Sequence, residues 1–162
     1  MRVTRLGSGD AGLLHQMMDL FSAAFEDPET YDSARPTDAY LNTLLARDSF
    51  IALVAWDAQR LVGGLTAYDL PKPERPQSEL YLFDLAVLKS HRRRGIATAL
   101  IAGLHGIAVA RQAAVVYVQA EPADDAAVAL YAKLGEGRDV LHFDLRPHAG
   151  AAARGAIGMA DE

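Results

Sequence analysis

Residues 83–98 read Phe-Asp-Leu-Ala-Val-Leu-Lys-Ser-His-Arg-Arg-Arg-Gly-Ile-Ala-Thr, and this stretch decides the fold. An apolar strand pattern ends at Leu88, a polar turn with three arginines follows, and apolar residues at helical spacing begin after Gly95. Free amides in the first turn of a helix, the positive end of its dipole and nearby guanidinium groups favour a phosphate-bearing ligand. Gly95 has no Cβ, so a ligand can approach the backbone closely there. The stretch therefore predicts a strand, an anion-binding loop and a helix start.

The loop has neither a Gly-x-Gly-x-x-Gly nor a Gly-x-x-x-x-Gly-Lys pattern, so it lacks the usual dinucleotide and nucleoside triphosphate fingerprints. A basic turn that opens an ordinary helix is the alternative interpretation. The rest of the chain has to decide between the two.

Composition limits the class of protein. With 162 residues, 51% of them hydrophobic, the chain has the material for one domain with a real core, expected at residues 1–147, followed by a flexible tail at 148–162. The absence of cysteine excludes disulfides, thiolate metal sites and a cysteine nucleophile. The five histidines show no metal-binding spacing, so no metal is expected.

Targeting and charge narrow the partners. The first residues lack the apolar core of a signal peptide, and no apolar run approaches the roughly 20 residues that span a bilayer. We therefore expect a cytoplasmic protein without a membrane partner. The net charge of −5 disfavours nucleic acid and suits a cationic partner.

Hydrophobic periodicity predicts an order of elements along the chain. Strands are expected at residues 3–6, 50–56, 60–68, 79–87, 114–120 and 140–145. Helices are expected at 10–25, 37–45, 97–108 and 124–134, with an acidic loop at 26–36 and a proline-rich loop at 71–76. In the last strand, Leu141, Phe143 and Leu145 are expected in the core. The order predicts a mixed α/β fold around one twisted sheet.

Two motifs carry a resemblance to a known family. Arg92-x-x-Gly95-x-Ala97, followed by Thr98, resembles the acetyl-CoA signature of the GCN5-related N-acetyltransferases. A second motif, Asp124-x-x-Ala127-x-x-Leu130-Tyr131-x-Lys133-Leu134-Gly135, resembles the other signature of that family, with Asp in place of Asn and Glu136 in place of Phe. Shorter strings over roughly residues 19–146, among them Tyr81-Leu82-Phe83-Asp84-Leu85-Ala86-Val87, resemble the type I aminoglycoside 3-N-acetyltransferases.

The resemblance implies a fold, a cofactor and two sets of binding residues. The fold is a mostly antiparallel twisted sheet, flanked by helices and splayed between its fourth and fifth strands, and a homodimer is allowed. The cofactor is acetyl-CoA, released as coenzyme A. The implied cofactor residues are Leu85, Ala86, Val87, Arg92, Arg93, Arg94, Gly95, Ile96, Ala97, Thr98, Asp124, Ala127 and Tyr131. For the cationic acceptor, the expected residues are Asp84, Glu79, Glu26, Asp27, Glu29, Tyr31, Asp32, Asp125 and Asp144.

Acetyl transfer from a thioester to an amine has three needs: a neutral amine, stabilisation of the carbonyl oxygen and a proton for the departing thiolate. Backbone amides at Ala86 or Val87 would polarise the carbonyl, and Tyr131 would protonate the thiolate. For the carboxylate that takes the amine proton, Asp84 ranks first and Glu79 second. The alternatives are a structural pairing of Asp84 with an arginine or backbone amide, and a purely core role for Tyr131.

The expected function is acetyl-CoA-dependent acetylation of an aminoglycoside, at the 3-amino group, which gives antibiotic resistance. One alternative is a polyamine, another small amine or a protein amine as the acceptor. The other is a cofactor-binding regulatory module without turnover.

Overall fold

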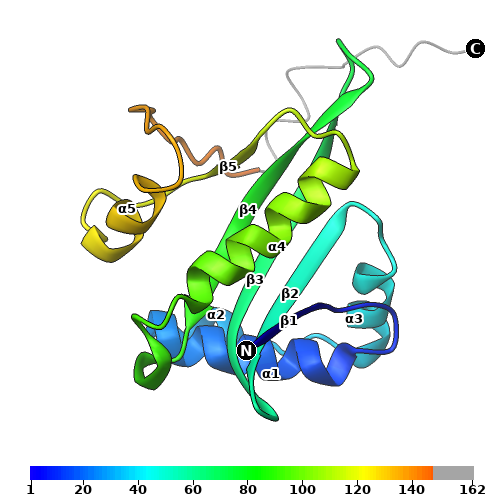
Figure 1. Ribbon diagram of the computed structural model, residues 1–162. Helices are drawn as coiled ribbons and strands as arrows, with labels where there is room; N and C mark the ends of the chain where they lie inside the picture. The colour runs from blue at the N-terminus through cyan, green and yellow to red at the C-terminus, as the bar shows by residue number, and fades with distance from the viewer. Residues whose placement is uncertain (148–162) are drawn as a thin grey trace, which may run out of the picture.

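A computed structural model describes residues 1–147, and these build one five-stranded sheet (Figure 1). The strands are β1 (Arg2–Arg5), β2 (Phe50–Asp57), β3 (Arg60–Lys72), β4 (Gln77–Val87) and β5 (Val116–Val118), and they lie in chain order. Neighbours are antiparallel except β4 and β5, which are parallel. The expected mixed α/β architecture is confirmed. The expected tail at 148–162 lies outside the described residues.

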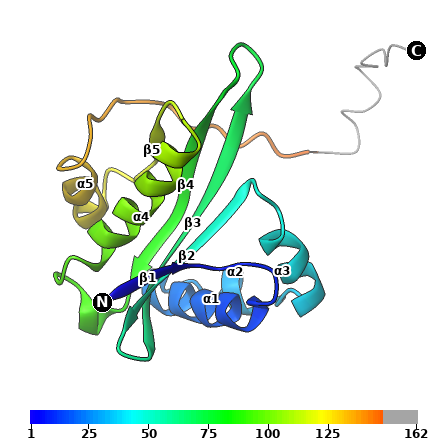
Figure 2. The same cartoon turned by 45° about the vertical axis from the view of Figure 1, so that its right-hand side comes forward.

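Helices cover both faces of the sheet (Figure 2). On one face, α4 (Ile96–Ala110) buries Ile96, Leu100, Ile101, Leu104 and Ala108 against the strands. On the other face, α1 (Ala11–Phe25) and α3 (Asp38–Leu45) enclose a second apolar core, and α2 (Pro28–Asp32) packs beside α1. A short 3₁₀ turn, η1 (Lys89–His91), leads into α4, and α5 (Asp125–Tyr131) follows β5.

The glycine pair in β3 permits close packing on both faces of the sheet. A Cβ added at Gly64 would stand 2.4 Å from Cγ of Met17, a fully buried α1 side chain. A Cβ at Gly63 would meet Ile96 of α4 at 3.0 Å. The two glycines therefore set how closely α1 and α4 approach the centre of the sheet.

A β-bulge in β4 sets the direction of the side chains near the centre of the sheet. Thr66 of β3 pairs with Asp84 and Ala67 pairs with Leu82, which leaves Phe83 without a partner on β3. Such an extra residue disturbs the ladder and re-aims the side chains around it.

The bulge explains how an acidic residue fits in an apolar central strand. Leu80 and Leu82 before the bulge, and Leu85 and Val87 after it, all pack against the α4 core. The alternation of side chains between the two faces thus shifts by one residue at the bulge. Phe83 and Asp84 therefore both lie on the face that α1 and α3 cover, opposite α4. The carboxylate avoids the α4 core for that reason.

The sheet splays at its β5 edge, as expected. β5 pairs with β4 only from Leu80 to Leu82, whereas β4 continues to Val87. On that side, residues 83–87 of β4 have no strand partner among the described residues, so backbone groups that point there are available to a ligand.

Several expectations about elements are wrong. Residues 140–145 form no strand: Leu141, Phe143 and Leu145 are 84%, 73% and 91% exposed instead of lying in the core. Alternating apolar and polar residues form a strand only where the segment pairs with the edge of a sheet, and no described strand pairs with residues 140–145. The expected buried strand at 114–120 is reduced to β5, whose three residues are half-buried.

Smaller differences have local causes. The proline-rich loop is shorter than the expected residues 71–76, because Pro71 still pairs with Ser78 of β4. On its other side β3 pairs with β2 only up to Tyr68, so Pro71 lies at a free edge, where proline is tolerated. The acidic loop contains α2, which Asp27 caps by accepting from the Thr30 amide. The last helix, expected to reach residue 134, ends at Tyr131 and continues as hydrogen-bonded turns.

Candidate active site

A cavity of about 580 Å³ opens where β4 splays from β5 and α4 begins. It is bounded by the end of β4, the loop before α4, the first turn of α4, α5 and the end of α1. Twelve of the thirteen expected cofactor residues line it: Leu85, Ala86, Val87, Arg92, Arg93, Gly95, Ile96, Ala97, Thr98, Asp124, Ala127 and Tyr131. The fold therefore gathers two distant motifs at one cavity.

The first turn of α4 presents unpaired backbone amides to this cavity. The first backbone bond of the helix runs from the Ala99 amide to the Gly95 carbonyl, and no side chain caps the helix start. The amides of Ile96, Ala97 and Thr98 consequently have no partner within the helix. With the positive end of the helix dipole, they form an anion-binding surface.

Gly95 is required by its backbone conformation. Its φ of 77° lies in the left-handed region, which side chains with a Cβ rarely adopt. A Cβ built there would meet no atom within 4 Å, so the position borders open space. Conformation and the approach of a ligand therefore both favour glycine.

The three arginines of the loop lie in different places: two line the cavity and one does not. Arg92 and Arg93 line the cavity, and the Arg92 Nε donates to the Val87 carbonyl at 3.3 Å. Arg94 is absent from the lining and donates to Asp57 at 2.9 Å. Arg94 therefore lies outside the cavity lining, paired with Asp57 at the β2–β3 turn, and its expected contact with the cofactor stays a prediction.

Tyr131, the last residue of α5, lines the same cavity. Burial, and secondarily the charge of Asp124, raise the pKa of its phenol. The hydroxyl therefore stays protonated at neutral pH and is available to donate a proton.

Asp84 lies on β4, one residue before the cavity-lining segment 85–87. The Thr66 hydroxyl donates to one carboxylate oxygen at 2.9 Å, and the Tyr31 hydroxyl donates to the other at 3.4 Å. Burial raises the pKa of this carboxyl, and these two hydrogen bonds lower it in part. Among the described residues no arginine pairs with Asp84, so the structural alternative of an arginine pair is not met. A half-buried carboxylate of raised pKa suits proton abstraction.

Glu79 is not brought to the same place. It stands opposite Leu70 near the start of β4, and Lys72 lies 3.6 Å from its carboxylate. At about 3.3 Å per residue, five positions along the strand separate it from Asp84 by roughly 15 Å.

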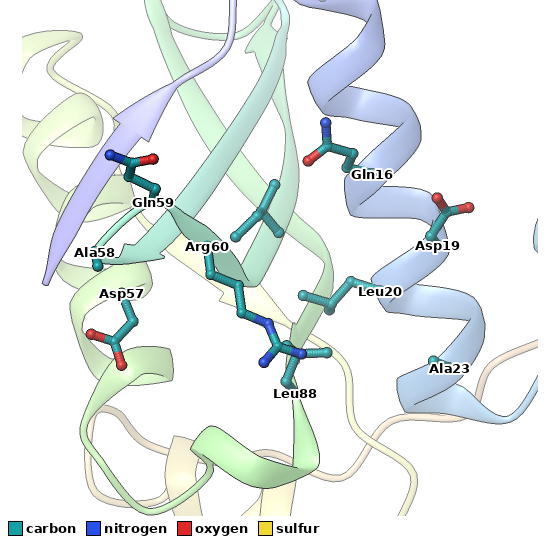
Figure 3. A pocket seen from close by; sticks show the side chains of 10 residues that line it. Gln16, Asp19, Leu20, Ala23, Asp57, Ala58, Gln59, Arg60 and Leu88 are labelled. Carbon is teal, nitrogen blue, oxygen red and sulfur yellow. The ribbon is translucent and has the colours of Figure 1, made fainter.

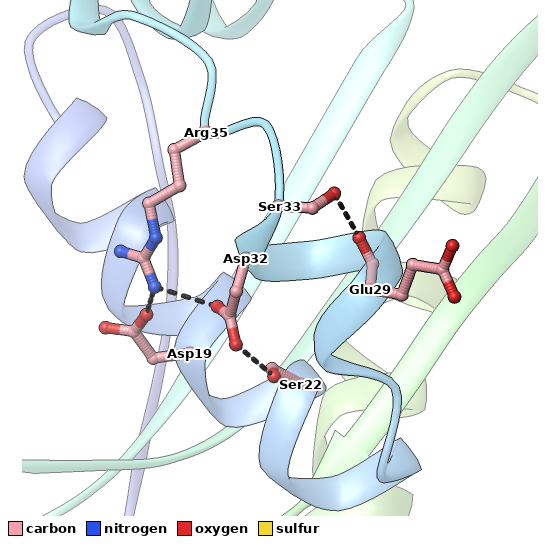
Figure 4. Close-up of polar contacts among 6 residues, drawn as sticks. All are labelled: Asp19, Ser22, Glu29, Asp32, Ser33 and Arg35. Atoms are coloured by element: carbon pink, nitrogen blue, oxygen red, sulfur yellow. Dashed lines mark hydrogen bonds and ion pairs between the residues drawn. The ribbon is translucent and has the colours of Figure 1, made fainter.

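Most of the acidic residues expected at the acceptor site are engaged within the chain. Glu26 accepts from Lys89 at 2.5 Å, which lowers the pKa of Glu26. Asp32 accepts from Ser22 and Arg35, and these bonds lower its pKa (Figure 4). Figure 4 also shows the Glu29 carboxylate pointing away from this network.

The remaining acidic positions are spread out. Asp124 caps α5 through the Ala127 amide at 3.0 Å, and Asp125 lies exposed in the first turn. Asp144 bonds to His142 in the segment that forms no strand. Tyr31, in contrast, reaches Asp84 directly, and burial raises its pKa.

Seven cavity residues were not identified from the sequence as site residues: Ala24, Phe25, His91, Ala126, Ala129, Leu130 and Lys133. Lys133 lies within the second motif, so its position there was a usable signal. Phe25 ends α1, some sixty residues from the motifs, and no local pattern indicates so distant a contact.

A larger hollow, about 710 Å³, lies on another side, between α1 and the β2–β3 turn (Figure 3). Its charged lining residues are largely engaged: Asp57 accepts from Arg94, and Asp19 pairs with Arg35. No residue of the two motifs lines it, so we do not assign it as the site.

A Gly-x-Gly-x-x-Gly string does occur elsewhere, at residues 7–12, and runs into the first two residues of α1. It is not a dinucleotide fingerprint, because β1 and β2 pair antiparallel and form no βαβ unit. None of its residues lines either cavity.

Comparison with protein families gives a direct result. The model of the Acetyltransferase (GNAT) family matches residues 14–135, which include both motifs and every strand from β2 to β5. The chain belongs to the GNAT acetyltransferase family.

Solved structures support the same assignment. An aminoglycoside acetyltransferase from an uncultured soil metagenomic sample is 48% identical to this GNAT chain, with a TM-score of 0.89 over 91% of this chain and 98% of the other. A second soil metagenomic aminoglycoside acetyltransferase, meta-AAC0020, solved in complex with sisomicin, is 29% identical, with a TM-score of 0.84 over 91% and 96%. A ribosomal-protein-alanine N-acetyltransferase from Brucella melitensis is 27% identical, with a TM-score of 0.70 over 90% and 99%. The search of curated proteins returned no match.

Two further observations on the described residues concern metal sites and membrane-spanning helices. Within residues 1–147, no three His, Asp or Glu side chains gather as a metal site would require. None of the helices in that part of the chain has both the length and the apolar composition needed to cross a bilayer.

Proposed function

We propose that this chain transfers an acetyl group from acetyl-CoA to an aminoglycoside, at the 3-amino group, and so confers antibiotic resistance on the cell in whose cytoplasm it works. The observation that carries the proposal is the pairing of two features. One is the 48% identity to an aminoglycoside acetyltransferase along nearly the whole of both chains. The other is a half-buried carboxylate, Asp84, beside a cavity that suits a phosphate-bearing thioester.

The residues around the cavity fit the cofactor. Acetyl-CoA supplies the acetyl group in activated form, as a thioester. The free amides at the start of α4, with Arg92 and Arg93, hold the pyrophosphate. The open space at Gly95 supports this assignment, because a phosphate must approach the backbone there.

The unpaired end of β4 supplies the carbonyl-binding group. Ala86 and Val87 line the cavity beyond the last residue that β5 pairs. An amide of this segment donates to the carbonyl oxygen as negative charge develops there. A single donor of this kind is typically worth about 2.7–4 kcal/mol.

Two side chains move protons. Asp84 accepts the proton from the attacking amine, directly or through a water, and its raised pKa makes it a better base than an exposed aspartate. Tyr131 donates its phenolic proton to the departing thiolate. The amine attacks the thioester directly, so the chain needs no nucleophile of its own.

A panel of acceptors tests the proposal. Purified protein with acetyl-CoA is assayed for free thiol release with gentamicin- and kanamycin-class drugs, spermidine and lysine peptides. We expect turnover with aminoglycosides at a kcat/KM far above that for the other amines. Preference for spermidine or peptides would replace the acceptor and leave the enzyme class intact, and binding of acetyl-CoA without turnover of any amine would indicate a regulatory module.

A further inference from the structure

An unusual row of aromatic rings crosses three strands beside Asp84. Tyr68 of β3 meets Phe83 of β4 edge to face at 5.7 Å between ring centroids. Phe83 meets Tyr81 in the same way at 5.6 Å, and Tyr81 stacks on Tyr117 of β5 at 4.9 Å. We call these four residues the aromatic row.

The row lies on the acceptor side of the sheet. Tyr68 packs against Phe50 of the α1–α3 core, which fixes the face on which the row lies. The bulge places Phe83 and Asp84 on that same face. Burial, and then the negative charge of Asp84, raise the pKa of Tyr68. Burial, then Tyr117, then Asp84 raise the pKa of Tyr81. The Asp84 carboxylate is therefore near both rings.

Phe83 is exposed although its strand is central. The residue is 57% exposed, whereas its neighbours in β4 are buried (Leu82) or half-buried (Asp84). A large apolar ring held between two others, yet open to solvent, is typical of a binding surface rather than of a core. The Tyr81 hydroxyl donates to Gln119 at 2.9 Å, which fixes one ring in place.

The chemistry of the row selects one kind of ligand. Aromatic faces attract ammonium groups and accept the C–H faces of ring sugars. The adjacent Asp84 adds negative charge, and the chain as a whole carries −5. The combination suits a rigid cationic sugar or cyclitol ring better than a linear amine, which has no ring to lie flat.

We propose that Tyr81, Phe83 and Tyr117 form a platform on which an aminocyclitol or amino-sugar ring of the acceptor lies, so that its amine reaches Asp84. This inference rests on the proposed function and adds the residues that select a ring-bearing acceptor. They are specificity-determining residues, not catalytic ones.

Three variants test the platform. Phe83→Ala removes the ring, Phe83→Leu retains apolar bulk without a ring, and Phe83→Trp restores an aromatic face. Val109→Ala, at an exposed position on α4, is the matched control. Kinetic constants are measured for a kanamycin-class drug, spermidine and acetyl-CoA, and drug binding to the protein with coenzyme A is measured by calorimetry.

For Phe83→Ala and Phe83→Leu we expect the KM and Kd for the drug to rise by about 3- to 30-fold, as for the loss of one aromatic contact with the ring of the acceptor. The KM for acetyl-CoA and for spermidine should stay within twofold, Phe83→Trp should recover drug binding, and the control should change nothing. An unchanged drug KM in Phe83→Ala, or an equal loss for spermidine, would overturn the platform.

The wild-type protein separates this inference from the proposed function. If it does not acetylate the drug yet binds it in a Phe83-dependent way, the platform stands and the proposed function falls. If it acetylates the drug and the Phe83 variants behave like wild type, the proposed function stands and the platform falls. If it neither acetylates nor binds the drug, both are overturned.

Discussion

Asp84 combines a cost in stability with the role of general base that we propose for it. Burial raises the pKa of its carboxyl above the ordinary value of 3.8, so the folded chain binds this proton more tightly than the unfolded chain. The stability that the protonated form contributes is complete below the unfolded pKa and is lost as pH rises through the folded pKa. At neutral pH the ionised carboxylate therefore destabilises the fold.

Replacing Asp84 with Asn should expose both effects. We expect Asp84→Asn to melt at a higher temperature than wild type at pH 8. This advantage should shrink as pH falls toward the ordinary value of 3.8, because the pKa of the folded wild-type carboxyl lies above that value. The same variant should lose kcat by on the order of 10²-fold or more, since the base is gone. Asp139→Asn, at an exposed position, is the control for both measurements. A variant that is fully active, or no more stable at pH 8, would contradict the role of Asp84.

Tyr131 allows a cleaner separation of binding from chemistry. Tyr131→Phe keeps the ring that lines the cavity and removes only the hydroxyl. We expect the Kd for acetyl-CoA and the melting temperature to change little while kcat falls by on the order of 10²-fold. Unchanged turnover would assign thiolate protonation to water.

Among the helices and strands, the start of α4 matters most for the proposed binding of acetyl-CoA. Gly95→Val should destabilise the protein by about 1–2 kcal/mol, because a β-branched residue must adopt a left-handed conformation. Its loss of acetyl-CoA affinity should exceed what this destabilisation explains, since the side chain projects into the cavity.

A second glycine of the same region provides the matched control. Gly106 lies within α4, and a Cβ there would meet no atom within 4 Å. Gly106→Ala should therefore stabilise the helix by about 0.5–1 kcal/mol and leave cofactor binding unchanged. Thermal melts and calorimetric titration with acetyl-CoA check both variants. Normal cofactor binding by Gly95→Val would show that the loop is misassigned.

The elements also show why sequence reasoning succeeds in one half of the chain and fails in the other. Local signals are strong around α4: apolar spacing, an arginine turn and a glycine in one stretch predict the helix and its uncapped first turn. At residues 140–145 the signal was equally clear, but a strand also needs a partner edge, and that depends on contacts far along the chain. The ion pair of Arg94 with Asp57 and the bulge at Phe83 likewise depend on neighbouring strands.

For the whole molecule, charge is the property that links fold and acceptor. The net charge of −5 favours a polycation, but Glu26 and Asp32 are already engaged with Lys89 and Arg35. Composition therefore predicts a cationic partner, whereas the structure shows which carboxylates are already paired within the chain.

A salt titration tests this distribution of charge. The KM for an aminoglycoside should rise with ionic strength, because attraction between exposed opposite charges is screened. Glu29→Gln should raise the KM at low salt and flatten its salt dependence, since this carboxylate points away from the ion-pair network. Glu26→Gln is the control and should do less, because Lys89 already neutralises that residue. Equal effects of the two variants would contradict the assignment.

The position of the new amide bond in the product tests whether the chain acetylates the 3-amino group of an aminoglycoside. The protein is incubated with ¹³C-labelled acetyl-CoA and a gentamicin-class drug, and the product is characterised by mass spectrometry and heteronuclear NMR. We predict one added acetyl group, with the labelled carbonyl attached to the nitrogen of the 3-amino group. Acetylation at another amine would contradict the proposed position, and the absence of any acetylated drug would contradict the proposed function itself.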